Sequence, residues 1–476
     1  MKFTKTVLAS LFTLSAAGAS AAAFQLAEIS TSGLGMAYAG NAAVADNASV
    51  VATNPALMTK FKQTEISAGG ILVDSDIDVH GKFTSGADAS HDNIVPNAII
   101  PNAYIVAPIN DRFSVGGGLN VNYGLKSEFG NHYSAGFFGG KTDLSAVNLN
   151  LSGAYKLGYG FSLGLGVNAV YAKAELERYL GLAGKGAALQ AQQKALQAKA
   201  AAQQAGAAAQ QLAQAGNLQA AAAAQTKAQE LAQLATQAGT VARTYATMDE
   251  SATIHRLKGD KWAFGWNAGL LYDFNENNRI GVAYHSPIKL KFNGKYSNTV
   301  PAAIPGVVDT ITGGAEINGS LALDLPAFWE ISGFHKLTEK FAVQYSYKYT
   351  NWNSLDSLDA YDSANNNRLF HKVEKFNDSQ RIALGFSYDV SEALTVRTGI
   401  AYDESASVKH PSISIPDTDR TWYSVGATYR FTPNLSADIG YSHLRGSKNS
   451  FNEEGKADFN VKAKAHLLGL NVNYKF

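Results

Sequence analysis

The final eleven residues of the chain, 466–476, alternate between apolar and polar side chains and predict a β-strand. Every second side chain is apolar, and the residues between them are small or polar. A period of two places the two sets on opposite faces of a strand. A strand with one apolar face, one polar face and a terminal aromatic residue is typical of a bacterial outer-membrane barrel. The apolar face comprises Leu468, Leu470, Val472, Tyr474 and Phe476.

The same alternation recurs along the chain, for example in residues 161–171, 341–350 and 435–442. Short and long connections alternate between such runs, as they do in barrels with tight periplasmic turns and long external loops. This pattern predicts an all-β fold, a 14-stranded antiparallel transmembrane β-barrel with both ends on the periplasmic side. The short connections lie near 110–112, 158–160, 275–278, 338–340, 391–393 and 432–434. The long connections lie near 77–96, 128–144, 178–259, 297–316, 354–378, 405–418 and 447–460.

Five tryptophans lie near the predicted strand ends. Aromatic rings gather at the two membrane interfaces, so these residues are expected to belong to aromatic girdles, although each alone could be ordinary core packing. A soluble all-β protein is the alternative, and it would be expected to show less regular loop lengths. The tryptophans are Trp262, Trp266, Trp329, Trp352 and Trp422.

The N-terminus predicts export. Lys2 and Lys5 precede a short apolar run, and Ala19-Ser20-Ala21 is a small-x-small cleavage site, so residues 1–21 are expected to be a signal peptide. The chain has no cysteine, which agrees with an oxidising folding route. A net charge of +1 gives no electrostatic case for nucleic-acid binding. After residue 21, no stretch has the roughly 18 consecutive apolar residues of a membrane helix.

Two segments do not follow the strand pattern. Residues 184–241 are rich in alanine and glutamine and contain no proline, which predicts a helical hairpin in the third external loop with a break at Gly216-Asn217. Residues 22–62 do not alternate, and a 14-stranded barrel is wide enough to need filling. We therefore expect an N-terminal hatch over 22–62 that plugs a barrel formed by residues 63–476, which includes the 184–241 insertion.

Several motifs resemble the FadL family of outer-membrane long-chain fatty-acid transporters, and the start of the hatch resembles its Pasteurellaceae members. The resemblance covers essentially the whole chain after the signal peptide. The longer Ala/Gln insertion is the main departure from the family. The motifs are Phe24-Gln25-Leu26, Ser32-Gly33-Leu34-Gly35, Ala45-Asp46-Asn47-Ala48, Asn54-Pro55-Ala56-Leu57, Phe264-Gly265-Trp266-Asn267-Ala268-Gly269 and the run from Ser412 to Arg420.

The resemblance implies a fatty-acid site inside the barrel. Arg178 matches a head-group arginine of the family, and Lys372 matches its second lumenal cation. Leu176 would line the tail site, and Phe24 resembles the hatch residue that reaches the ligand. Without the resemblance, either cation would be read as a solvated charge at a strand end. A buried carboxylate without a partner is costly, so a cation at one end of an apolar tunnel suits such a ligand.

The resemblance also implies a gate and an exit. The hatch segment Asn54, Pro55 and Ala56 matches the part whose movement opens the channel, although it could be an ordinary turn. Gly124 interrupts an alternating third strand, where glycine weakens pairing and permits a kink. In the family this kink opens the barrel wall sideways. Asp403 matches a lumenal acid for which no role is specified. The resemblance implies an external groove between the third and fourth loops. It would be lined by the fourth-loop residues Val300, Ile304, Val307, Val308 and Ile311, although these could equally be buried against the barrel.

These observations predict passive, ligand-gated uptake of long-chain fatty acids or similar hydrophobic molecules, with lateral exit through the wall. Expected partners are the hydrophobic ligand, outer-membrane lipid and lipopolysaccharide, and the barrel assembly machinery, which would recognise Phe476. We expect a monomer with no cofactor and no bound metal. The alternatives are a general porin and a surface adhesin that acts through its long loops. An enzyme is not expected, because no nucleophile motif or metal-ligand spacing stands out.

Overall fold

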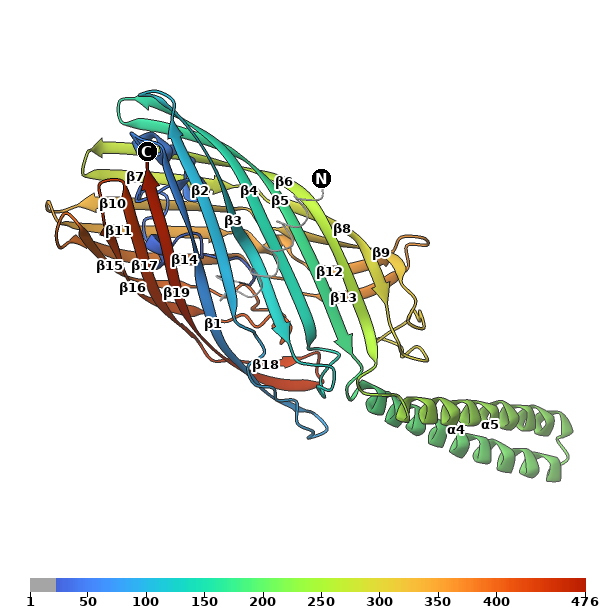
Figure 1. Cartoon of the computed structure of the whole chain (residues 1–476). Coiled ribbons are helices and arrows are strands. Elements are labelled where there is room, and N and C mark those ends of the chain that lie inside the picture. Colours follow the sequence, from blue (N-terminus) through green and yellow to red (C-terminus); the bar gives the residue numbers. More distant parts are fainter. Residues whose placement is uncertain (1–22) are drawn as a thin grey trace.

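The computed structural model describes residues 23–476, which form a closed antiparallel β-barrel with a long helical hairpin at one end (Figure 1). The predicted signal peptide, residues 1–21, lies outside the described residues. The barrel closes where β1 (Glu65–Phe83) pairs with β19 (Ala457–Lys475), from Glu65 opposite Lys475 to Phe83 opposite Ala457. The predicted 14-stranded antiparallel barrel is therefore confirmed.

Nine of the barrel strands are continuous and five consist of two segments. Besides β1 and β19, the continuous strands are β2 (Ala98–Pro108), β3 (Phe113–Glu128), β4 (Gly140–Gly158), β5 (Phe161–Tyr179), β6 (Thr253–Asn275), β15 (Leu394–Asp403) and β16 (Arg420–Arg430). The segmented strands are β7 (Asn278–His285) with β8 (Ile288–Ser297), β9 (Ile317–Leu325) with β10 (Phe328–Lys336), β11 (Phe341–Thr350) with β12 (Ser357–Asp362), β13 (Arg368–Val373) with β14 (Ser379–Asp389), and β17 (Leu435–Gly446) with β18 (Asn449–Glu453).

Four neighbouring strands, the seventh to the tenth, are interrupted next to one another. Pro287 lies in the first break and Pro326 in the second. Proline has no backbone N–H and cannot complete a ladder, so it ends pairing at these points. The interruptions leave irregular backbone in this part of the barrel wall.

The two faces of β19 differ as the alternation predicts. Leu470 and Val472 are 60% and 53% exposed, whereas Asn471 and Asn473 between them are 2% and 4% exposed. An exposed row of apolar side chains around a closed barrel is the surface that meets lipid, and the polar row faces the interior. The closing strand therefore presents its aliphatic side chains outward and its asparagines to the hatch side.

Three predicted loops are shorter than expected because strands continue into them. β1 runs on to Phe83, β12 and β13 occupy much of 354–378, and β18 lies within 447–460. The outer part of β1 pairs with β19 from Ile77 opposite Ala463 to Phe83 opposite Ala457. In this part of β1 the polar residues His80 and Lys82 are exposed and the apolar residues Val79 and Phe83 are buried, the reverse of the lipid-facing pattern in β19. A search for strands with an apolar outer face therefore misses such segments.

The girdle prediction is wrong for two of the five tryptophans, which are core residues instead. Trp262, Trp266 and Trp329 are partly exposed on the outer surface. Trp352 and Trp422 are fully buried in the interior, where Trp352 contacts Phe24 and Trp422 contacts Tyr38 of the hatch. Position near a strand end does not show on which side of the wall a ring lies.

The hatch fills the barrel interior as the sequence predicts. Its short helices are α2 (Thr31–Leu34), α3 (Val50–Thr53) and the 3-10 helix η1 (Pro55–Lys60). Ser30 caps α2, because its Oγ accepts a hydrogen bond of 3.1 Å from the Gly33 N–H. The α2 helix packs against β16, β17 and β19, whereas η1 packs against β4, β5 and β6. The hatch thus contacts opposite parts of the wall.

Glycines of the barrel wall make room for the hatch. The glycine belt is a set of wall positions where an added Cβ would collide with hatch atoms. At Gly426, for example, such a Cβ would lie 2.8 Å from the Gly35 Cα atom, and at Gly440 it would lie 2.6 Å from the Thr31 carbonyl oxygen. The hatch backbone therefore lies directly on the wall backbone. The belt comprises Gly116, Gly164, Gly269, Gly281, Gly385, Gly399, Gly426, Gly440 and Gly469.

The Ala/Gln-rich insertion forms the predicted helical hairpin, with α4 (Ala183–Gln214) and α5 (Leu218–Ala246). It projects from the end of the barrel opposite the C-terminus (Figure 1). The turn lies at the predicted break, where Gly216 has a φ of +81°. The two helices pack through an alanine seam, whose buried members are Ala188, Ala191, Ala198, Ala209, Ala221 and Ala228. None of the described helices has the length and the hydropathy needed to cross a membrane.

The base of the hairpin packs on the fourth external loop. Val300, Ile304 and Val308 are buried in a cluster with Leu180, and the Tyr245 hydroxyl donates a 2.8 Å hydrogen bond to the Ala303 carbonyl. Of the two possibilities for the five apolar loop residues, burial therefore applies to three of them. Their burial follows from the neighbouring hairpin base, which the loop sequence alone does not reveal.

Candidate functional site

An apolar cavity lies inside the barrel, bordered mainly by β3 to β6, β8, β9 and β12. The space between its walls is about 700 Å³, part of which is open to solvent. Lumen-facing side chains of these strands form most of its wall, and the hatch contributes Phe24. The apolar lining residues are Phe24, Leu125, Leu144, Ala174, Leu176, Leu257, Phe292, Leu321, Leu323, Leu358 and Ile415.

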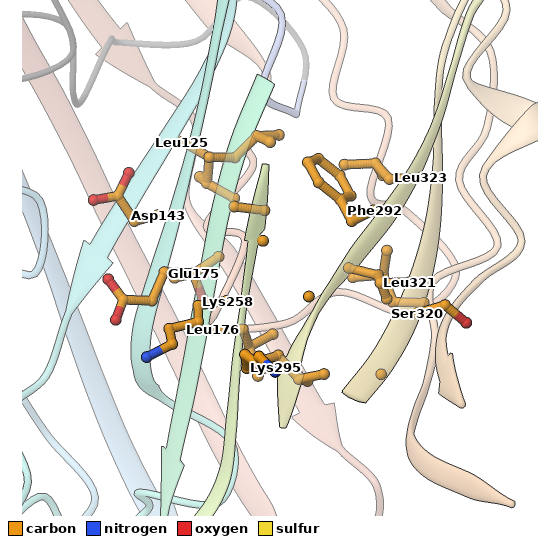
Figure 2. Close-up of a pocket in the computed structure, with 18 of the residues that line it drawn as sticks. Leu125, Asp143, Glu175, Leu176, Lys258, Phe292, Lys295, Ser320, Leu321 and Leu323 are labelled. Atoms are coloured by element: carbon orange, nitrogen blue, oxygen red, sulfur yellow. The ribbon is translucent and has the colours of Figure 1, made fainter. Parts of the chain in front are cut away.

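Strand alternation keeps charged side chains out of this cavity although they belong to the same strands. The carboxylates of Asp143 and Glu175 point away from it, whereas Phe292 and Leu321 face Leu125 across it (Figure 2). Glu175 instead forms a 2.7 Å ion pair with Lys141. The cavity is therefore suited to an apolar ligand.

Three paired glycines leave one part of the cavity wall without side chains. Gly259 of β6 lies opposite Gly294 of β8, and Gly294 lies opposite Gly319 of β9. All three line the cavity. A row of glycines across three strands lets a ligand approach the backbone closely.

A polar cavity adjoins the apolar one along β5. Leu176 lines the apolar cavity and Arg178 lines the polar one. These residues are two apart on one strand face, a separation of about 7 Å. Lys372 lines the polar cavity too, with Arg368, His371 and His255. The two predicted cations therefore lie on one cavity, next to the apolar space.

Arg178 is fixed in place by the β4–β5 strand pair. Its side chain is 2% exposed. Its Nη1 donates to the carbonyl oxygens of Lys141 at 3.1 Å and Glu177 at 2.8 Å, and its Nη2 donates to the Thr142 hydroxyl at 3.2 Å. These bonds use three of the five N–H groups of a guanidinium. The cation is thus held rigidly at the end of the apolar cavity.

Lys372 is paired with an acid that sequence reasoning did not find. Its Nζ lies 2.7 Å from Oε1 of Glu453, and the two side chains are 12% and 4% exposed. The partners are 81 residues apart in the chain and belong to β13 and β18. Nothing in the local sequence of Glu453, within a predicted polar loop, distinguishes it from its neighbour Glu454.

Phe24 reaches the apolar cavity from the hatch, at the position expected for a ligand contact. Its ring lies edge-on to Trp352 with centroids 4.7 Å apart, and it lies 6.3 Å from the ring of Tyr123. Sequence reasoning also missed the inward orientation of Trp352, which packs on Phe24. Trp352 lies two residues after the end of β11, in the 3-10 helix η2 (Trp352–Ser354), and this position in a strand break conceals its orientation.

The barrel wall has a gap in pairing between β2 and β3. Their ladder ends at Ala103 opposite Leu119, whereas β3 stays paired with β4 as far as Glu128. The β3–β4 register shifts between Val121 and Tyr123. A bulge of this kind bends a strand and ends pairing with its neighbour.

Hatch residues occupy this gap. The Gly124 N–H donates to the Phe24 carbonyl at 3.0 Å, and the Leu26 N–H donates to the Asn122 carbonyl at 2.8 Å. A Cβ at Gly124 would lie 3.2 Å from Leu26 Cδ1. Gly124 is therefore found beside the irregularity, where residues 24–26 act as a short extra strand on β3.

The other predicted gating residues lie elsewhere in the hatch. Asn54 is fully buried, and its Nδ2 donates to the Ala42 carbonyl at 2.7 Å and to the Leu270 carbonyl at 3.3 Å. Pro55 and Ala56 lie directly on the belt glycine Gly164. Asn54, Pro55 and Ala56 line neither of the two cavities in the described part of the chain. Their contacts fix the hatch body to the wall.

Asp403 also holds the hatch and lies outside both cavities. It forms a 2.9 Å ion pair with Arg381 and accepts a 2.6 Å hydrogen bond from the Trp422 indole. Arg381 in turn donates to the carbonyl of hatch residue Ala37 at 2.8 Å. Asp403 therefore orients an arginine that binds the hatch backbone.

Comparison with known sequences identifies a family and several relatives. The profile of the outer membrane protein transport proteins (OMPP1/FadL/TodX) matches residues 12–476. The chain is 54% identical to a 47 kDa outer membrane protein of Pasteurella multocida, covering 100% of this chain and 99% of that protein. It is 46% identical to outer membrane protein P1 of Haemophilus influenzae, covering 100% of both. It is 41% identical to the long-chain fatty acid transport protein of Escherichia coli, covering 100% and 99%.

Solved structures share the fold. A Pseudomonas aeruginosa FadL homologue superposes with a TM-score of 0.75 at 21% identity, covering 96% of this chain and 100% of that one. The Pseudomonas putida toluene transporter TodX superposes with a TM-score of 0.64 at 16% identity, covering 95% and 99%. These likenesses support the barrel architecture.

Proposed function

Because this chain belongs to the family of outer membrane protein transport proteins (OMPP1/FadL/TodX), we propose that it takes up long-chain fatty acids or similar amphiphiles. It is a protein of the bacterial outer membrane, and its family transports hydrophobic molecules. The transport is passive and gated by the ligand. A relative with 41% identity carries the name long-chain fatty acid transport protein, which supports this substrate class.

The observation that carries the proposal is the adjacency of the two cavities along β5. Leu176 and Arg178 project from one strand face, the first into the apolar cavity and the second into the polar one. An amphiphile with an acyl tail and a carboxylate head needs both environments in this order, because its tail seeks apolar surface and its head needs a cation. The tail would contact Phe24 and Leu176, and the head would be held by Arg178 and Lys372.

Lateral exit through the wall is the second part of the proposal. The gap between β2 and β3 is occupied by hatch residues 24–26, and Phe24 also lines the apolar cavity. Leu125 lines the apolar cavity and a further cavity that borders Ala23 and the β1, β17 and β19 side of the interior. A ligand that displaces this segment would therefore have a path from its site to the gap. Hydrophobic cargo that leaves sideways avoids the aqueous periplasm.

Substitution of Arg178 tests the head-group site. In Arg178→Met, purified protein should bind oleate about 10-fold more weakly or worse, because a charge-assisted hydrogen bond is lost in a buried site. Binding of oleyl alcohol should change less. Oleate uptake by a strain without its own transporter should fall in parallel.

Arg256→Met is the matched control, since Arg256 lies on the outer face of β6 at 46% side-chain exposure and pairs with Glu177. This control should bind oleate as the wild type does. Unchanged oleate affinity in Arg178→Met would overturn the proposed head-group site.

A further inference from the structure

We infer that Glu453 is an internal competitor for carboxylate ligands, so that a fatty-acid head group reaches Lys372 only by displacing the Glu453 side chain. The inference rests on the proposed function and adds to it a residue that determines specificity. Glu453 is the last residue of β18, at the start of the tight turn that leads into β19.

The groups around Glu453 are those that a ligand carboxylate would seek. Its Oε1 accepts from Lys372 Nζ at 2.7 Å and from the Ser412 hydroxyl at 2.9 Å, and its Oε2 accepts from the Ile413 N–H at 3.1 Å. A cation, a hydroxyl and a backbone amide together form a good carboxylate site. The side chain of the protein itself already occupies this site.

The charges near the head-group site explain why a second carboxylate cannot simply be added. Glu453 and Glu374 both lie within electrostatic range of Arg178, and Lys372 acts on Glu374. Lys372 and Glu453 themselves form a buried ion pair, which is neutral as it stands. A fatty-acid anion added at Lys372 would bring a second buried negative charge to this pair, which is costly unless Glu453 moves away.

Of the two acids Glu374 and Glu453, Glu453 is the one whose side chain can move away from Lys372. Glu374 is fully buried between β13 and β14. Glu453 instead directly precedes an exposed turn, in which Glu454 and Gly455 have positive φ values of 53° and 70°. A short strand end beside a turn can rotate outward without disturbing the barrel wall. Neutral amphiphiles would need no such movement, because they bring no charge to the cluster.

The test compares two probes that differ only in their head group, oleate and oleyl alcohol. Their affinities are measured by calorimetry on the full-length protein purified in detergent. In Glu453→Gln, oleate should bind about 10-fold more tightly than in the wild type, the scale of one charge-assisted contact. The affinity for oleyl alcohol should stay the same.

The matched control is Glu454→Gln, which removes the same charge one residue away. Glu454 also lines the polar cavity, but it is exposed and pairs with Lys456 at 2.8 Å. Its substitution should leave both affinities unchanged. Equal gains in the two Gln variants would show a general charge effect and overturn the role of Glu453.

Three further outcomes distinguish a failure of this inference from a failure of the proposed transport function. If oleate binds the wild type and Glu453→Gln equally, the inference is wrong and the transport proposal stands. If neither probe binds the wild type, the transport proposal fails and the inference fails with it. If Glu453→Gln does not fold, Glu453→Asp serves instead, since the shorter side chain loosens the contact with Lys372 without removing the charge or any group of the carboxylate site. It should strengthen oleate binding to a smaller extent, and unchanged oleate binding there would overturn the inference.

Discussion

At the residue scale, Glu28 is the hatch residue whose burial has the clearest consequence. It is fully buried, and burial raises the pKa of its carboxyl to about 7, against the nearby backbone amides and Arg420, which act in the opposite direction. If the segment 23–29 is released, this carboxyl meets solvent and returns to its ordinary value of 4.5. The seated and released states therefore bind protons differently between these two values.

The sign of the pH effect follows from this difference. Below pH 4.5 the Glu28 carboxyl is protonated in both states, and the free energy that favours the seated state over the released state is at its largest. Between pH 4.5 and 7 only the released state ionises, so seating weakens as the pH rises, by about 3 kcal/mol in all. A spin label on Ala23→Cys should therefore be more mobile at pH 8 than at pH 5.

The control for this prediction is Glu28→Gln, which has no ionisable group and should show the same mobility at both pH values. The label is specific because the chain has no other cysteine. An identical pH response in wild type and Glu28→Gln would exclude Glu28 as its origin.

At the element scale, the contact between the hatch and β3 predicts that a disulfide between them blocks transport. Gln25 and Tyr123 are antiparallel bridge partners. Such partners have Cα atoms about 4.5 to 5.5 Å apart, a distance that suits a disulfide. The double variant Gln25→Cys with Tyr123→Cys should lose oleate uptake when oxidised and recover it after reduction, because the crosslink holds the segment in the wall gap.

A second cysteine pair distinguishes the effect of holding the hatch segment from the effect of crosslinking the barrel wall. Ala103→Cys with Leu119→Cys joins the last paired position of β2 and β3 without involving the hatch. Its oxidation should leave uptake largely intact. If the hatch crosslink forms and uptake persists, residues 24–26 are not the gate.

The same element scale shows what sequence patterns could and could not predict. Membrane-crossing strands were predictable, because lipid on one side forces apolar residues to every second position, as in β19. The segments β12, β13 and β18 were not, since they lie beyond that constraint and are held by backbone pairing with their neighbours. For the site, Leu176 and Arg178 share one strand face by period alone. The pairing of Lys372 with Glu453 depends on strands brought together by the closed barrel, which no local pattern records.

At the scale of the whole molecule, the hairpin and the barrel are nearly separate bodies. The buried residues of the hairpin pack between α4 and α5, and only its base contacts the barrel loops, through Tyr245 and the cluster around Ile304. Replacing residues 190–240 with a short Gly/Ser linker should therefore leave oleate binding and uptake unchanged. Uptake is measured once circular dichroism has verified the strand content.

The control for this deletion is a change at the hairpin base. Ile304→Ala removes a buried side chain and should destabilise the fourth loop by about 2 to 5 kcal/mol, as large-to-small core substitutions do. Loss of uptake in the linker variant with an intact barrel would instead assign the distal hairpin a part in transport.

The glycine belt makes the hatch and the wall a matched pair. Each belt position lacks a side chain because a hatch atom lies against it. A substitution in the wall or in the hatch would therefore require a compensating substitution in the other. The hatch is therefore not an interchangeable cassette. A hatch from another member of the family would fit this barrel only if its close contacts with the wall fell on the same glycines. A barrel engineered for a new ligand should therefore keep its own hatch.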